Sequence, residues 1–241
     1  METDIFNLEN YEIFDLTHTM YHRMPSWPGH SEFTVQDLKI LNIDGYAVKK
    51  ISMNTHHGTH IDVAAHMIED GKTLEKYPIT SFIGSGVAID FSNKKPGEPI
   101  ESEDFDEYKD VIHNNDMVFI HTGWDKKRGN NKEYLYLWPY LDISGAEFLT
   151  SKKIKLVGTD GLSIGGWSSE TPMHKQITDT AKKVHEIILN SGAIIAEEVA
   201  NIDKLLLNEK YVNALFFVMP LNIMDSDGSP VRILAFKQVK K

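Results

Sequence analysis

Six short, largely apolar runs constrain the fold more than any other feature of this sequence. They cover residues 86–91, 117–121, 155–159, 193–196, 214–218 and 231–236. Apolar runs of this length are typical of strands that are buried on both faces. Three further runs, residues 11–16, 33–41 and 47–53, mix apolar and polar side chains and also predict strands. The sequence therefore predicts a sheet-rich domain.

Helical patterns separate several of these runs. Residues 144–151 carry Ser144 and Glu147 at the spacing of a capping box. Residues 178–190 have apolar side chains at helical spacing, and residues 202–207 predict a short third helix. We find no linker, no internal repeat and no Rossmann or phosphate-loop glycine motif. These patterns predict a single mixed α/β domain in which strands outnumber helices.

Composition excludes several classes of function. The chain has 241 residues, a net charge of −10 and no cysteine. An acidic chain is a poor partner for nucleic acid or for an anionic membrane surface. Without cysteine, any metal must be held by imidazole and oxygen. No apolar run approaches the roughly 20 residues of a membrane span, and the first residues do not resemble a signal peptide. We therefore expect a cytoplasmic protein.

Four of the 11 histidines lie in residues 56–66, HHGTHIDVAAH. No regular structure can place His56, His60 and Asp62 around one ion. In a strand they share a face but span about 20 Å, and in a helix Asp62 lies far round from His60. The backbone must bend, and Gly58 tolerates the dihedral angles of such a bend. His66, four residues beyond Asp62, could share a helical face with it.

This set of side chains suits a metal ion. Two imidazoles and a carboxylate without sulfur fit Zn²⁺ or Mn²⁺. Three protein ligands leave a position for water, whose pKa zinc lowers to about 7. Asp62 could bridge two ions, and His66 is left as a general acid/base. A lone histidine is more often a packed or surface residue, but four in one segment argue against that interpretation. We assign no ligand role to His57.

The same segment resembles the HxGTHxDxPxH signature of the metal-dependent cyclase family, which includes bacterial kynurenine formamidases and isatin hydrolases. Shorter similarities are MPSWPG from residue 24, HTGW from residue 121, LVGTD from residue 156 and DGSPVR from residue 227. The resemblance covers about residues 12–236. It implies the swivelling β/β/α fold of this family as one domain over residues 1–241, assembled as a dimer or tetramer.

The resemblance also implies a ligand set. A first ion would be held by His56, His60 and Asp62. A second would be held by Asp62, a later histidine and a glutamate twelve residues further on, and His185 and Glu197 have that spacing. From the residues alone, His185 would be interpreted as a residue at a helix border, and Glu197 as a polar residue at a strand end. Both interpretations remain open for a protein with one metal.

Two more positions match family roles, and three depart from the family pattern. His66 matches the acid/base, and Trp27 matches an aromatic residue that packs on the substrate. The proline of the signature is Ala64 here. The residue after W-P-G, often acidic in the family, is His30, and the residue after the second-site glutamate, commonly asparagine, is Glu198. These departures bear on the substrate more than on the metal chemistry.

We therefore expect a hydrolase that uses one or two Zn²⁺ ions, with Mn²⁺ as the other candidate, and a metal-bound hydroxide to cleave the amide bond of a small molecule. N-formylkynurenine, giving kynurenine and formate, is the first candidate substrate. A cyclic amide such as isatin, or another lactam or lactone, is the alternative. A non-catalytic ligand-binding protein on the same fold and a purely structural metal site are rival interpretations. The complete ligand set argues against the first, and the open coordination position against the second.

Overall fold

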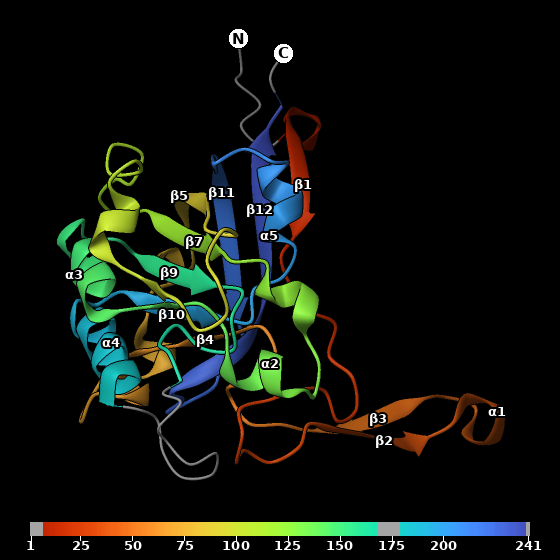
Figure 1. The fold of residues 1–241 in the computed structure, drawn as a ribbon. Coiled ribbons are helices and arrows are strands. Elements are labelled where there is room, and N and C mark those ends of the chain that lie inside the picture. The colour runs from red at the N-terminus through yellow and green to blue at the C-terminus, as the bar shows by residue number, and fades with distance from the viewer. Residues whose placement is uncertain (1–6, 168–178, 240–241) are drawn as a thin grey trace.

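The computed structural model describes residues 7–167 and 179–239. It is dominated by one sheet in the order β1-β12-β11-β5-β7-β9-β10-β4 (Figure 1). Because β4 also pairs with β12, all of these strands except β1 form a closed barrel. The strands are β1 (Tyr11–Asp15), β4 (His60–Asp62), β5 (Ile83–Asp90), β7 (Met117–His121), β9 (Leu156–Thr159), β10 (Ile194–Glu197), β11 (Tyr211–Pro220) and β12 (Gly228–Gln238). The predicted single mixed α/β domain is confirmed.

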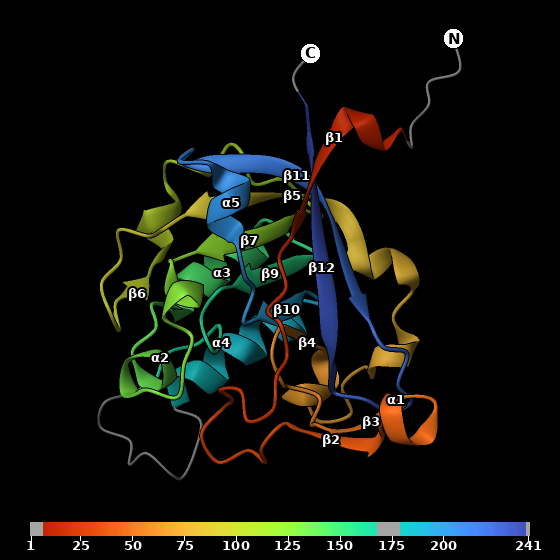
Figure 2. The same cartoon turned by 90° about the vertical axis from the view of Figure 1, so that its right-hand side faces the viewer.

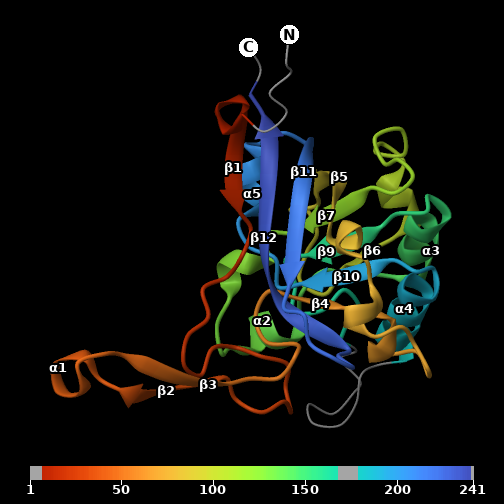
Figure 3. The same ribbon diagram turned by 180° about the vertical axis from the view of Figure 1, so that it is seen from behind.

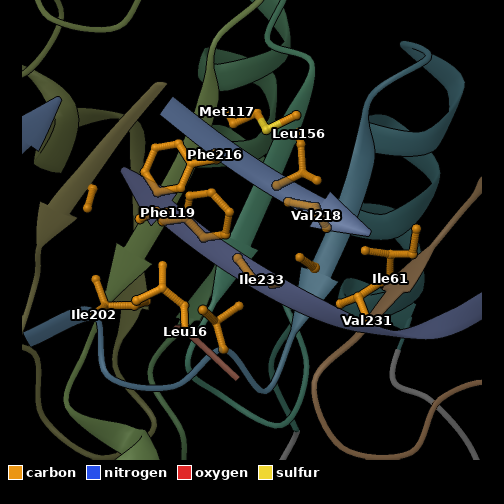
Figure 4. Close-up of a cluster of buried hydrophobic side chains, with 14 of the residues drawn as sticks. Leu16, Ile61, Met117, Phe119, Leu156, Ile202, Phe216, Val218, Val231 and Ile233 are labelled. Atoms are coloured by element: carbon orange, nitrogen blue, oxygen red, sulfur yellow. The ribbon is translucent and has the colours of Figure 1, made fainter. Parts of the chain in front are cut away.

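Strands β5, β7, β9 and β10 run parallel. Strands β7, β9 and β10 are buried throughout, and β5 is buried over residues 86–89. In β7, Met117 and Phe119 belong to the cluster that fills the barrel (Figure 4). Val118 and Ile120 face the other way and pack in a second cluster with residues of two helices, α3 (Ile143–Ser151) and α4 (Asp179–Asn190). These helices cover the parallel half of the barrel (Figure 2), so the continuous apolar runs have a physical explanation.

The prediction that residues 214–218 and 231–236 are buried on both faces is wrong. In β11, Phe216 and Val218 are fully buried, whereas the intervening Phe217 is only partly buried. The same alternation occurs in β12. These two strands lie in the antiparallel half of the barrel, where α3 and α4 do not cover the outer face (Figure 3). Sheets of this kind bury one face and leave the other partly in solvent.

The predicted helices at residues 144–151, 178–190 and 202–207 correspond to α3, α4 and α5 (Ile202–Leu206); residue 178 lies outside the described residues. The predicted capping box at Ser144 is wrong. Asp142 caps α3, because its Oδ1 accepts from the backbone N–H of Gly145 at 2.8 Å. The Ser144 hydroxyl donates to the same oxygen at 2.8 Å.

A hairpin of β2 (Thr34–Lys39) and β3 (Val48–Ser52), joined by α1 (Leu41–Asp44), projects away from the barrel (Figure 1). We call it the arm. A short helix α2 (Lys132–Tyr136) and a two-stranded sheet of β6 (Pro99–Ile100) and β8 (Tyr140–Leu141) complete the α-helices and strands of the described residues, which also contain several short 3-10 helices. Among those residues, no helix has the length and apolar character that crossing a membrane requires.

Candidate metal centre

The backbone bends between the arm and the barrel, at the position that the sequence predicts. Gly58 has a φ of +68°, and strand β4 begins two residues later. His60 and Asp62 alternate with Ile61 in β4 and therefore lie on the same face, while His56 lies in the turn before it. The predicted helical face shared by Asp62 and His66 is wrong, because Asp62 lies in a strand and His66 ends a separate 3-10 turn, Ala64–His66.

Asp62 lies at the centre of the site. Its Oδ1 is 2.7 Å from Nδ1 of His56 and 3.5 Å from Nε2 of His60. Its Oδ2 is 3.9 Å from Nε2 of His185, and this buried oxygen has no hydrogen-bond partner among the described residues. The two oxygens thus face two different groups of histidines, which is the arrangement that a bridging carboxylate requires.

The structure also brings His185 and Glu197 to this place. His185 lies inside α4 and Glu197 at the end of β10, and Nε2 of His185 is 3.2 Å from Oε1 of Glu197. The other oxygen of Glu197 is 3.5 Å from Nε2 of His60. The hydroxyl of Ser163 and the backbone N–H of Ile164 donate to Oε1 at 3.0 and 2.7 Å. All five residues predicted as metal ligands therefore meet in one cluster.

Hydrogen bonds on the far side of two rings define which nitrogen faces the cluster. Nδ1 of His60 donates to the carbonyl of Gly58 at 2.7 Å, and Nδ1 of His185 donates to the carbonyl of Ala181 at 2.7 Å. Since a carbonyl only accepts, each Nδ1 carries a hydrogen, and in the neutral ring each Nε2 then offers a lone pair to the cluster. Metal-binding histidines are held in this way by acceptors on the outer nitrogen.

Electrostatics also favour a cation. Although burial disfavours a charged imidazole, Asp62 and Asp227 raise the pKa of His56 to about 10. Burial likewise opposes charge on His185, but the hydrogen bond and charge of Glu197 raise its pKa. Despite complete burial, the nearby histidines hold the pKa of Asp62 well below its usual range. A buried carboxylate with an unpartnered oxygen and lone pairs aimed at it fits Zn²⁺ or Mn²⁺.

A cavity of about 170 Å³ opens onto this cluster. His66 lines it, and the centroid of its ring is 4.2 Å from that of His56. Trp27 also lines it and packs against Trp138 and Trp167, with ring centroids 6.0 and 5.1 Å away. Further lining residues are His30, Met67, Leu162 and Glu198. The cavity therefore combines the cluster with an aromatic wall.

Glu198 adds a buried ion pair to that wall. Its Oε2 accepts from Nε of Arg128 at 2.9 Å and from the hydroxyl of Tyr134 at 3.0 Å. The backbone of Glu198 has a φ of +50°, a left-handed conformation that asparagine tolerates better than glutamate. Glutamate at position 198 is therefore explained by its contacts with Arg128 and Tyr134, and not by the local backbone conformation.

Sequence reasoning missed two residues of the site, Ser163 and Asp227. Oδ2 of Asp227 is 2.8 Å from Nε2 of His56 and 3.5 Å from Nδ1 of His66. Asp227 is the first residue of the DGSPVR segment, whose similarity to the family was the available signal, but no role was assigned to that segment. His57, by contrast, turns away: it accepts from the backbone N–H of Asn54 and donates to the carbonyl of Ser31.

A second buried cluster, His121, Asp125 and Asp160, is a poorer metal site. The carboxylate of Asp160 already accepts from the hydroxyl of Thr122 and from three backbone N–H groups, those of residues 122, 123 and 124. The carboxylate therefore stabilises the turn after β7 and has little capacity left for an ion.

The fold and the site define a mixed α/β barrel protein with a histidine–carboxylate centre of the metal-binding type. The chain belongs to the putative cyclase family, whose profile matches residues 14–165. It is 26% identical to a kynurenine formamidase from Bacillus cereus over 226 residues, which cover 93% of this chain and 97% of that protein. A kynurenine formamidase from Bacillus anthracis is 28% identical over 220 residues, covering 90% and 94%.

Solved structures show the same fold. Isatin hydrolase A from Labrenzia aggregata, solved with benzyl benzoate bound, has a TM-score of 0.82 and 22% identity, and the match covers 97% of this chain and 96% of that one. A potential metal-dependent hydrolase with cyclase activity has a TM-score of 0.73 and 23% identity, with coverage of 95% and 100%. The fold expected from the family resemblance is therefore confirmed.

Proposed function

We propose that this chain is a metal-dependent hydrolase that cleaves the amide bond of an aryl formamide, with N-formylkynurenine as the first candidate substrate. One observation carries the proposal: site-facing nitrogens of three histidines converge on Asp62 and Glu197 beside an open cavity. The names of the relatives from Bacillus cereus and Bacillus anthracis support the choice of reaction.

The ligands we propose are His56, His60 and Asp62 for one ion, and Asp62, His185 and Glu197 for a second. Zn²⁺ or Mn²⁺ bound there would supply a water molecule activated for attack and would polarise the carbonyl group. Ser163 and the backbone of residue 164 hold Glu197 in place through its Oε1.

Two residues act on the substrate in this proposal. Trp27 packs against the aromatic ring, since it lies in the cavity beside two other tryptophans. His66 moves the proton: it accepts a proton from the water that adds to the formyl carbon, and it donates that proton to the leaving nitrogen as the C–N bond breaks. The side chain of His66 is 22% exposed and so can exchange protons with solvent. The products are formate and the free arylamine.

The test is an assay of protein that has been stripped with a chelator and reloaded with Zn²⁺ or Mn²⁺. We expect metal-dependent release of formate from N-formylkynurenine, with slower opening of isatin and of simple lactams. Faster opening of isatin would favour the cyclic-amide alternative. Binding of these compounds without turnover, with either ion, would contradict the proposal and favour a non-catalytic ligand-binding protein.

We also propose that the chain forms a homodimer or homotetramer through the arm. A two-stranded hairpin is at best marginally stable alone in water, yet this one exposes large apolar side chains, including Leu41 at 62% and Ile43 at 79%. Light scattering should show a dimer or tetramer for the wild-type protein and a smaller species for Ile43→Lys. Leu8→Lys, at an equally apolar exposed position outside the arm, is the control and should leave the mass unchanged.

A further inference from the structure

Asp227 contacts both His56 and His66, the residues proposed above as a ligand and as the acid/base. Its Oδ2 is 2.8 Å from Nε2 of His56 and 3.5 Å from Nδ1 of His66. Its Oδ1 accepts from the hydroxyl of Thr55 at 2.8 Å. One carboxylate is thus fixed by the turn that carries His56 and lies against two rings of the site.

Strand pairing places this carboxylate. The backbone carbonyl of Asp227 accepts from the N–H of Val63 at 3.0 Å, and Gly228 pairs with Asp62 in the register of β12 and β4. A Cβ on Gly228 would lie 2.4 Å from the carbonyl oxygen of Ile61 and 3.1 Å from the His56 ring. Glycine is therefore required for β12 to approach so closely, and the D-G pair of DGSPVR has a structural reason.

His56 differs from the other two histidines of the cluster in its outer partner. His60 and His185 each donate to a backbone carbonyl, whereas His56 meets the charged carboxylate of Asp227. A carboxylate on the outer nitrogen fixes the tautomer, holds the ring and makes the opposite nitrogen a stronger donor to a metal. With the hydrogen on Nε2, Nδ1 of His56 is left facing Asp62.

We propose that Asp227 is the positioning residue of this site: it holds the His56 ring with Nδ1 toward the metal position and holds His66 beside it. The inference rests on the proposed metal site, but it does not depend on the identity of the substrate. Replacing the carboxylate by an amide puts an N–H donor or a weaker acceptor opposite Nε2 of His56. The ring can then take its other tautomer, whose hydrogen on Nδ1 points into the metal position.

The experiment compares Asp227→Asn with Asp225→Asn. Both remove one negative charge from the same loop, but Asp225 is exposed, and its φ of +54° is a conformation that asparagine tolerates. The dissociation constants of Zn²⁺ alone and of Mn²⁺ alone are measured by competition with a chromophoric chelator. We expect affinity to fall about 10- to 100-fold in Asp227→Asn and to stay within about twofold in Asp225→Asn, relative to the wild-type protein.

A second variant keeps the inference testable if Asp227→Asn does not fold. Thr55→Val removes only the hydrogen bond to Oδ1 of Asp227, and we expect a smaller loss of metal affinity in the same direction. At saturating metal, Asp227→Asn should also lower kcat with KM nearly unchanged, because His66 is displaced while Trp27 is not. Metal affinity equal to wild type in both variants would overturn the inference, as would a wild-type protein that binds neither ion.

The two proposals fail in different ways. Weakened metal binding in Asp227→Asn, in a protein that hydrolyses none of the amides offered, would support the positioning role and contradict the proposed function. Unchanged metal binding in that variant, in a protein that releases formate from N-formylkynurenine, would do the reverse.

Discussion

Replacing Glu198 by asparagine in the wall of the cavity breaks an ion pair but relieves backbone strain. These two effects change the free energy of unfolding in opposite directions. Glu198 is 1% exposed, and the side chain of its partner Arg128 is 7% exposed. Arg128 Nη2 is also buried with no hydrogen-bond partner among the described residues. Within the described part of the chain, Glu198 is the one carboxylate that forms an ion pair with this guanidinium. The substitution relieves the left-handed strain at residue 198 but leaves the guanidinium without its ion-pair partner.

The sizes of the two effects decide whether the substitution stabilises or destabilises the protein. Removing one partner of a buried ion pair costs about 3–5 kcal/mol, and relieving a left-handed non-glycine residue returns about 1–2 kcal/mol. We therefore expect Glu198→Asn to lower the free energy of unfolding by about 1–4 kcal/mol. For a chain of this length each kcal/mol shifts Tm by about 2–4 °C, so Tm should fall by roughly 2–16 °C. Glu198→Gln keeps the strain and should lose at least as much.

Thermal and urea unfolding of the metal-free proteins would measure this, with Arg128→Met to complete a double-mutant cycle. Arg128→Met alone leaves a buried carboxylate and keeps the strain at residue 198, so it should be destabilised by about 3–5 kcal/mol, more than Glu198→Asn. The double variant should be less destabilised than the sum of the two single variants, because neither charge is then left buried without its partner. A Glu198→Asn protein as stable as wild type would show that strain outweighs the ion pair and would refute the reasoning.

Three further predictions concern the metal centre. His60→Ala should lose bound metal in elemental analysis, because it removes the residue between Asp62 and Glu197; full metal content would contradict its role as a ligand. His66→Ala should lower turnover about 10²- to 10⁴-fold with metal content near wild type, and unchanged turnover would exclude it as the acid/base. In metal-free protein, the raised pKa of His56 means that its charged form stabilises the fold below about pH 6.5. This contribution should be lost as the pH rises toward 10, and urea unfolding that is flat from pH 7 to 10 would contradict it.

The sequence predicted the strands well because most of them are continuous apolar runs. The closure of the barrel could not be predicted, since it depends on β4, a three-residue strand with the sequence HID. A segment so short and polar gives no strand signal of its own. The arm was likewise predicted as ordinary strands of the domain, because local pattern does not report whether a hairpin packs on a core or projects from it.

The residues of the site likewise fall into those that the local spacing could predict and those that it could not. The spacing of His56, His60 and Asp62 requires a bend in the backbone. Local geometry alone sets this requirement, so the bend could be predicted from the sequence, and it occurs at Gly58. Asp227 is far away in the sequence, and its contact with His56 depends on the register of β12 against β4. Register between distant strands is set by the whole barrel, so no local pattern could have shown this contact.

The site lies along the seam where the barrel closes. In the register of β10 and β4, Glu197 is paired with His60, and in that of β12 and β4, Gly228 is paired with Asp62. Residues paired across antiparallel strands have Cβ atoms about 4.5–5.5 Å apart. The pairing of β10 with β4 therefore places the carboxylate of Glu197 beside the His60 ring. An ion held by β4 and β10 together would in turn fasten the seam. Metal binding and barrel stability should therefore be coupled, since a ligand that binds only the folded state stabilises it.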